Sequence, residues 1–239
     1  MQIDVVTIFP EMFAPVLGAS ILKRAQDRGV VQIQLHNLRD YTADKRRTVD
    51  DRPYGGGPGM VMKPEPIFHA IEAIEASHHV PPTTRTTSQC RVTLMAPQGV
   101  PLTQSLAKEL SGLSHLVILC GHYEGVDERI RQALVDQEIS IGDYVLTGGE
   151  LPAMVLIDGV VRLLPGALGH EAATQEESFE NGLLEYPQYT RPPVFRSMEV
   201  PAVLRTGNHQ QVKTWRKLQA LARTLTWRPD LSQTFHRES

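Results

Sequence analysis

The sequence predicts an α/β fold with a mainly parallel sheet, followed by a small helical domain. Between residues 2 and 164, short apolar segments rich in β-branched residues alternate with segments whose apolar residues keep helical spacing. Three apolar segments lead directly into glycine-rich loops, as is typical of strands whose carboxyl ends face a ligand. After residue 204 the chain becomes basic and keeps helical spacing, which predicts the second domain.

Two strands and two helices are predicted before residue 80. The apolar segment IDVVTIF predicts a buried strand. A helix follows at 11–28, and its inner face would carry Phe13, Leu17 and Ile21. The alternating segment VVQIQLH predicts a strand with one face in water. Three isoleucines with helical spacing predict a second helix at 64–77, after a glycine-rich loop.

Three further strands are predicted in the second half of this region. The segment RVTLMAPQG predicts a strand and a turn, and LVILCGHYEG predicts a strand and a loop, after which Asp127 would cap a helix from about 128. SIGDYVLTGGE predicts a strand and a glycine turn. Pro152 then stands in the first turn of an apolar helix that is expected to run to about Leu164.

A change of composition predicts the domain boundary. Residues 165–190 contain five glutamates and no lysine or arginine, whereas basic residues dominate after 204. We therefore predict a first domain at 1–164, a linker at 165–185 and a helical domain at 186–239. The inner side of its main helix would carry Val212, Trp215, Leu218, Leu221 and Leu225. The basic side chains leave two interpretations open, a solvated surface or a patch that contacts nucleic acid.

Bulk composition excludes several classes of protein. The chain has 239 residues, 41% hydrophobic and 21% charged, and its net charge of −3 gives no overall attraction to nucleic acid. Cys90 and Cys120 are too few for a disulfide framework, and neither a signal peptide nor a membrane span is expected, so we expect a cytoplasmic protein. The scattered histidines predict no metal site, and no P-loop, G-x-G-x-x-G or G-x-S-x-G motif occurs.

Several long segments resemble one known family. The segments VDDRPYGGGPGMVMK, GHYEGVDERI, SIGDYVLTGGELPAM, RLLPGALGHEA, EESF, GLLEYPQYTRP and WRKLQALARTL resemble, in order and spacing, the bacterial tRNA (guanine-N1)-methyltransferase (TrmD) family. The resemblance covers nearly the whole chain. It implies a SPOUT-type α/β fold with a trefoil knot, S-adenosyl-L-methionine as methyl donor, and tRNA as partner. It also implies a homodimer whose active site lies between subunits.

The reaction implied is methylation of N1 of the guanosine immediately 3′ of the anticodon, at position 37. Two alternatives remain open, a SPOUT-type RNA methyltransferase with another target base and a non-catalytic RNA-binding module. Dependence on a divalent cation cannot be read from the residues.

The resemblance also assigns residues. Those implied to bind the methyl donor are Pro97, Gly99, Gly121, Glu124, Ile141, Gly142, Asp143, Tyr144, Val145, Leu146, Thr147, Gly148, Gly149 and Pro152. Those expected to contact tRNA or its target guanosine are Asp50, Arg52, Tyr54, Gly55, Gly59, Ser178, Lys213, Arg216 and Lys217. The glycine-rich loop would shape the pocket for the guanosine.

The chemistry needs one base and one cation. Guanine N1 carries a proton that a base must remove, and negative charge then moves toward O6, where a cation stabilises it. The resemblance implies Glu177 as the base and Arg162 as the cation, with Glu176 as the neighbouring alternative. The chain departs from the family pattern in three places: Glu177 replaces the usual aspartate, His122 an arginine and Gln188 a histidine.

Overall fold

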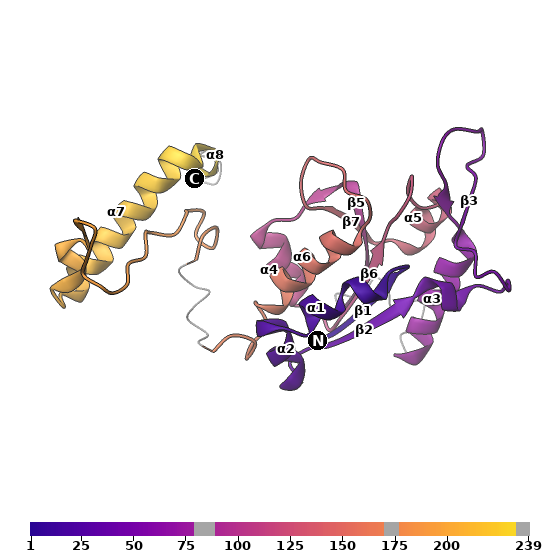
Figure 1. Ribbon diagram of the computed structural model, residues 1–239, viewed down its shortest axis with the longest axis horizontal. Coiled ribbons are helices and arrows are strands. Elements are labelled where there is room, and N and C mark those ends of the chain that lie inside the picture. The colour runs from indigo at the N-terminus through magenta and orange to yellow at the C-terminus, as the bar shows by residue number, and fades with distance from the viewer. Residues whose placement is uncertain (79–88, 170–176, 233–239) are drawn as a thin grey trace. The chain divides into compact units, whose positions relative to one another are not determined.

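The computed structural model describes residues 1–78, 89–169 and 177–232. The chain divides into two compact units, Met1–Gly169 and His170–Ser239, and each is described by itself (Figure 1). Within the described ranges, no helix combines the length and the hydropathy needed to cross a lipid bilayer.

The apolar segments of the first unit form a five-stranded sheet in which every pair is parallel. The strand order is β2-β1-β6-β5-β7. The strands are β1 (Gln2–Thr7), β2 (Gln32–Asn37), β5 (Cys90–Pro101), β6 (His115–Cys120) and β7 (Gln137–Ser140). Every residue of the central strand β6 is buried, whereas Gln32 and Gln34 of the edge strand β2 are exposed. The predicted α/β fold with a parallel sheet is therefore confirmed. The strand predicted in SIGDYVLTGGE was wrong, because β7 ends at Ser140 and residues 141–149 form a loop.

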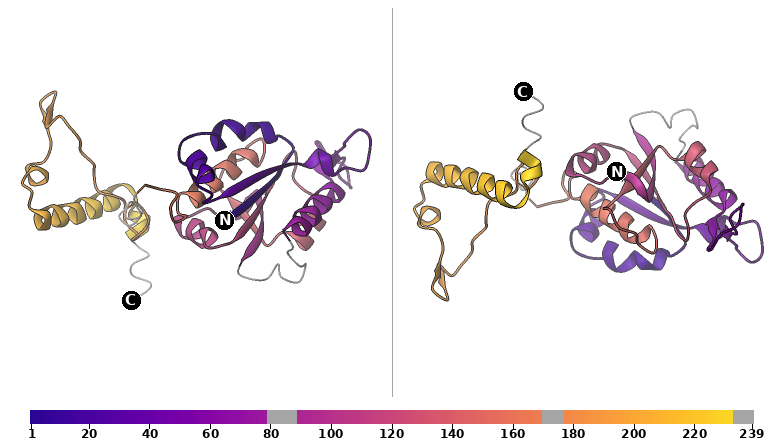
Figure 2. Two further views of the ribbon diagram at one scale, coloured as in Figure 1. Left: turned by 90° about the horizontal axis from the view of Figure 1, so that it is seen from below. Right: turned by 90° about the horizontal axis from the view of Figure 1, so that it is seen from above.

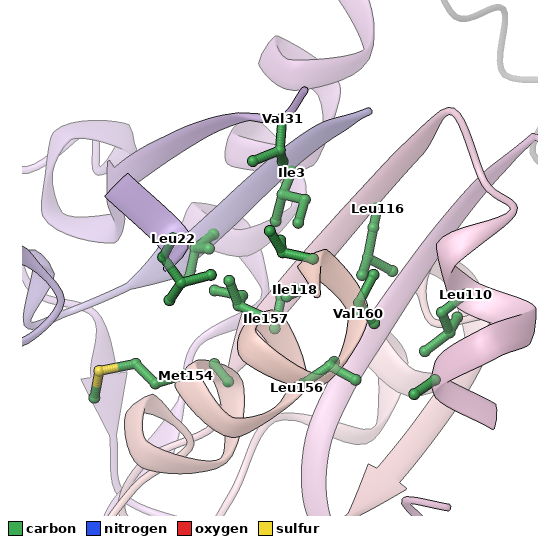
Figure 3. Close-up of a cluster of buried hydrophobic side chains, with 14 of the residues drawn as sticks. Ile3, Leu22, Val31, Leu110, Leu116, Ile118, Met154, Leu156, Ile157 and Val160 are labelled. Carbon is green, nitrogen blue, oxygen red and sulfur yellow. The ribbon is translucent and has the colours of Figure 1, made fainter. Parts of the chain in front are cut away.

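Helices cover both faces of this sheet (Figures 1 and 2). One buried cluster combines the sheet with α1 (Ala14–Leu17), α2 (Ser20–Asp27), α4 (Gln104–Ser111) and α6 (Glu150–Val161). The other combines it with α3 (Pro64–Ser77) and α5 (Glu128–Leu134). Figure 3 shows Ile157 and Val160 of α6 pointing toward Ile3 and Ile118 of the sheet, and all four are 0% exposed. Burying one such side chain contributes about 1.5–3 kcal/mol.

Smaller elements connect these layers. They are the 3-10 helices η1 (Pro10–Met12) and η2 (Leu38–Tyr41) and the paired strands β3 (Asp50–Asp51) and β4 (Val61–Met62). The strands β3 and β4 form the base of the glycine-rich hairpin, residues 50–62.

Two helix predictions for the first unit were wrong in detail. The helix predicted at 11–28 is split, because Ala19 is extended (φ −129°, ψ 159°) and separates α1 from α2. The break rotates the inner face of α2, so that Leu22 is buried and Ile21 is only half-buried. The apolar helix that was expected to reach Leu164 ends at Val161.

The second unit consists of a hairpin and helices. Its elements are β8 (Val194–Phe195), β9 (Met198–Glu199), η5 (Ala202–Arg205), α7 (His209–Trp227) and α8 (Pro229–Ser232). The predicted inner face of α7 was partly wrong, because Leu218, Leu221 and Leu225 are 44–60% exposed. The buried residues of α7 are Ala220 and Thr224. Thr224 Oγ1 accepts a hydrogen bond from Leu184 N at 2.8 Å, so a polar contact fastens the preceding segment to the helix.

Candidate functional site

A cavity of about 310 Å³ lies at the carboxyl ends of β5, β6 and β7. This volume lies within the range of small-molecule sites, and this end of a parallel sheet is where ligands bind in open α/β folds. Its walls come mainly from three loops, at residues 94–98, 121–126 and 139–149. The three glycine-rich loops predicted to bind a ligand therefore share one cavity.

A break in the β5–β7 ladder opens the first wall. Met95 and Val100 both pair with Ile139, so the four residues between them leave the ladder. Pro97 and Gln98 in this bulge line the cavity. Gly99 does not line it, and packs against β7 instead.

The other two walls are hydrogen-bonded to each other. Gly149 N donates to Gly121 O at 2.7 Å, and His122 forms an isolated antiparallel bridge with Gly148. A Cβ atom on Gly149 would lie 2.8 Å from Cys120 Cα and from Gly121 N. Contacts this short with backbone atoms are excluded for any side chain, so glycine is required where the two loops meet.

The cavity presents apolar surface and backbone polar groups. Tyr144, Val145 and Leu146 are 56%, 83% and 38% exposed at its wall. Arg131 also lines the cavity, and its guanidinium forms an ion pair with Glu138, with 2.5 Å between Nη2 and Oε1. Such a site suits a ligand with a flat ring and hydrogen-bonding edges, because loops supply the backbone groups and the apolar side chains cover its faces.

Two polar residues, Glu150 and His122, meet near the cavity, and the role of Glu150 was missed in the sequence. Glu150, the first residue of α6, is 1% exposed and accepts a hydrogen bond from Thr7 Oγ1 at 2.8 Å. His122, which lines the cavity, has its Nδ1 atom 3.6 Å from Glu150 Oε2 and packs against Phe9. A carboxylate at a helix start is stabilised by the helix dipole. The feature of the sequence that could have identified Glu150 is its position directly after Gly148 and Gly149, at the start of a helix.

The glycine-rich hairpin is fastened to one wall of the cavity. Met62 N donates to Gly125 O at 2.9 Å, and Glu124 N donates to Met60 O at 3.0 Å. Gly59 has a φ of +82°, and a Cβ atom there would lie within 2.2 Å of the Glu124 carboxylate. At the hairpin tip Tyr54 is fully exposed. Of the hairpin residues predicted to contact the acceptor, Gly59 lies beside Glu124 at the cavity wall, and none of them lines the cavity.

The cavity collects most of the residues predicted to bind the methyl donor. Its lining includes Pro97, Gly121, Glu124, Ile141, Gly142, Tyr144, Val145, Leu146, Thr147, Gly148, Gly149 and Pro152. Gly99 and Asp143 lie outside the lining. Arg162 also lies outside it, as the C-cap residue of α6. Arg162 follows Gly149 by thirteen positions, which is roughly 20 Å along a helix axis.

A groove of about 810 Å³ lies within the second unit. Glu177 lines it together with Lys213, Arg216 and Lys217 of α7. Arg216 stacks over the ring of Tyr186, with 4.5 Å from Cζ to the ring centroid. Ser178 Oγ accepts a hydrogen bond from Glu185 N at 2.9 Å and so orders the segment beside Glu177. Glu176 lies outside the described residues.

Comparison with known proteins gives one consistent result. A family model described as tRNA (Guanine-1)-methyltransferase TrmD matches residues 1–234. The tRNA (guanine-N(1)-)-methyltransferase of Staphylococcus epidermidis strain ATCC 35984 is 55% identical over 235 residues, which are 98% of this chain and 92% of that protein. The proteins of the same name from Moorella thermoacetica and Bacillus cereus are 57% and 56% identical, over 97% of this chain and 90% and 91% of theirs.

Proposed function

The chain belongs to the tRNA (guanine-1)-methyltransferase family, and we propose how its residues carry out that family's reaction. It is a methyltransferase that uses S-adenosyl-L-methionine to methylate N1 of guanosine 37 in tRNA. The observation that carries the assignment of residues is the cavity at the carboxyl ends of β5, β6 and β7. The residues that resemble the family's donor-binding loops converge there.

S-Adenosyl-L-methionine fits this cavity by its chemistry. Tyr144, Val145 and Leu146 offer apolar faces for the adenine ring, and backbone groups of the two glycine loops other than the paired Gly149 N and Gly121 O would meet its edge. When bound, the donor supplies a methyl group on a positively charged sulfur, which departs as a neutral thioether. We propose that the contact between the Gly121 and Gly149 loops belongs to a SPOUT-type trefoil knot.

During the reaction, the residues of this chain must remove the proton on guanine N1 and stabilise the negative charge that develops on the base. Glu177 takes the proton from guanine N1, which frees the nitrogen lone pair to form the new bond to the methyl carbon. Arg162 stabilises the negative charge that develops on O6 while the proton is lost. Both assignments rest on the resemblance to the family pattern and on the chemistry of the reaction.

The position of Arg162 supports a homodimer with shared active sites. Leu151 and Val155 are 50% and 49% exposed on the outer side of α6, and Arg162 continues the same helical stripe. Arg162 is roughly 20 Å along the helix from Gly149, beyond reach of the cavity in its own chain. Val155 lies near the midpoint between them.

Antiparallel pairing of two α6 helices about Val155 would therefore bring Arg162 of one copy to the cavity of the other. It would also cover the exposed apolar stripe. We propose that two copies pair in this way.

The acceptor is held by the second unit and by the hairpin. We propose that Lys213 and Lys217 contact tRNA phosphates beside the groove that contains Glu177. The hairpin residues Asp50, Arg52, Tyr54, Gly55 and Gly59 would approach the target guanosine. In this proposal the segment 165–185 links the two domains, and because tRNA is the substrate we expect the enzyme in the cytoplasm.

One experiment tests the proposal and its rival. Unmodified tRNA transcripts are incubated with the protein and the donor, and the methylated nucleoside is mapped by mass spectrometry. We expect 1-methylguanosine at position 37 only, and no product when that guanosine is replaced by adenosine. Methylation of another base would support a SPOUT-type enzyme with a different target. Donor binding without any transfer would support a non-catalytic RNA-binding module.

A further inference from the structure

A second cluster of ionisable side chains lies at the opposite end of the sheet from the cavity. Asp4 of β1 and His115, the first residue of β6, meet there with His78, which follows α3. His115 begins β6, and the cavity residue Gly121 directly follows the strand, so the two sites are roughly 20 Å apart along it. Neither the donor nor the acceptor proposed above uses these residues.

The three side chains direct their ligand atoms to one point. Asp4 Oδ2 lies 2.8 Å from His115 Nε2 and 3.2 Å from His78 Nε2, and all three atoms lie within 4.8 Å of one another. Two ligands of a tetrahedral zinc ion are about 3.3 Å apart when each bond is about 2.0 Å. The spacing is therefore close to that of a zinc site before the ion enters.

The outer contacts orient the same three groups. Asp4 Oδ1 contacts His36 Nε2 at 2.6 Å, which leaves Oδ2 facing the two histidines. His115 Nδ1 faces Cys90 Sγ at 3.6 Å, so Nε2 faces the cluster. The Cys90 sulfur can accept a hydrogen bond from a protonated His115 Nδ1. In that tautomer Nε2 carries a lone pair, which is what a metal ion needs. Partners that fix the free ring nitrogen and the free carboxylate oxygen are typical of metal ligands.

The carboxylate at the centre of the cluster is fully buried and surrounded by nitrogen atoms. Gln2 Nε2 donates a hydrogen bond to Asp4 Oδ2 at 3.3 Å, beside the His115 Nε2 contact at 2.8 Å. Asp4 is thus a fully buried carboxylate that faces several histidines, and a cation can take the place of their protons.

We propose that Asp4, His78 and His115 bind a divalent transition-metal ion, with zinc as the preferred ion. Two imidazoles and one carboxylate are the ligand types that zinc favours. The ion would link the end of α3 to the sheet. His78 is the entry side, because its side chain is 28% exposed whereas Asp4 and His115 are nearly inaccessible.

Cobalt titration of untagged full-length protein tests this site. After treatment with a chelator, the wild-type protein should bind one Co²⁺ per chain, with the intense visible bands of tetrahedral cobalt, and Zn²⁺ should displace it. No sulfur-to-cobalt charge-transfer band should appear, because Cys90 faces the outer nitrogen of His115. The melting temperature should rise with Zn²⁺.

The matched variants are His78→Gln and His69→Gln. Both histidines belong to the α3 region, and His69 is an exposed residue nine positions before His78 that makes no polar contact with Asp4 or His115 within the described ranges. His78→Gln should weaken Co²⁺ binding at least tenfold and abolish the Zn²⁺-dependent rise in melting temperature, whereas His69→Gln should behave as wild type. Three results would overturn the proposal: no binding by the wild-type protein, equal binding by His78→Gln, or a charge-transfer band that makes Cys90 a ligand.

Discussion

Helix α6 of the first unit and helix α7 of the second differ in what they bury. Ile157 and Val160 of α6 are completely buried against the sheet. Leu218 and Leu225 of α7 are 60% and 53% exposed. Among the described residues of the second unit only Ala220 and Thr224 are buried. The packed core of the first unit thus keeps the cavity loops in place. The second unit buries little apolar surface, and polar and cation–π contacts stabilise its fold.

This difference matches the two tasks. A site that wraps a small donor needs loops held in place to within a fraction of an ångström, and a packed core supplies that rigidity. A surface that meets a large, charged partner can leave apolar and basic side chains exposed until that partner or a second copy covers them.

The largest expected effect concerns stability. Ile157→Ala should lower the free energy of unfolding by about 2–5 kcal/mol, because it leaves a cavity in a closed core. Leu218→Ala, on α7, should change it by less than about 0.5 kcal/mol. Urea denaturation followed by circular dichroism, at one protein concentration, measures both. Equal losses would show that α7 has a core of its own.

A charge on the outer stripe of α6 should have the next largest effect. Val155→Asp should convert the dimer to a monomer and lower the methyl-transfer rate roughly hundredfold or more, because Arg162 loses its place at the other copy's cavity. Leu225→Asp, at a position of similar exposure on α7, should leave the dimer intact. Analytical ultracentrifugation and single-turnover kinetics give the two readouts. A dimeric, active Val155→Asp enzyme would refute the antiparallel pairing.

A substitution where the two cavity loops meet should have the third largest effect, on the affinity for the methyl donor. Gly149→Ala forces a Cβ atom onto the backbone of Cys120 and Gly121, and should weaken donor binding at least tenfold in calorimetry. Gly169→Ala is the control, because a Cβ atom there meets nothing within 4 Å. Wild-type affinity in Gly149→Ala would remove the cavity from the proposed donor site.

The smallest expected effect concerns tRNA affinity. Lys213→Ala combined with Lys217→Ala should weaken tRNA binding a few-fold and reduce the salt slope of log K by about 1.4–1.8, since each phosphate contact contributes about 0.7–0.9. Arg216 is left unchanged because its stacking on Tyr186 supports the fold of the unit. Lys23→Ala with Lys108→Ala, two exposed lysines of the first unit, is the control. An unchanged slope would show that the α7 lysines are only solvated.

The sequence was most informative where local pattern and tertiary packing agree. The isoleucines of 64–77 predicted α3 to the residue, and Asp127 caps α5 through a hydrogen bond from Arg129 N. The break before Ser20 could not be seen, because the segment 11–28 keeps helical spacing on both sides of it. The inner face of α7 was misjudged for another reason: its leucines follow a helical stripe that the unit itself leaves uncovered.

The two candidate sites also differ in how far the local sequence pattern predicts them. Glycine-rich loops after strands predicted the cavity, because carboxyl ends of neighbouring parallel strands meet. The cluster of Asp4, His78 and His115 could not be predicted from the sequence. Its members come from three distant segments and do not show the short sequence spacing typical of metal ligands. The burial of Glu150 below the cavity also depends on a contact with Thr7 that only the folded chain brings about.

The central claim is that the first unit binds the donor and the second unit supplies the base. Glu177→Gln tests it most directly, with donor affinity measured by calorimetry and methyl transfer measured in a single turnover. We predict an unchanged donor affinity and a rate lowered roughly hundredfold or more, with most of the rate restored in Glu177→Asp. A normal rate in Glu177→Gln, or a loss of donor binding, would contradict this division of labour.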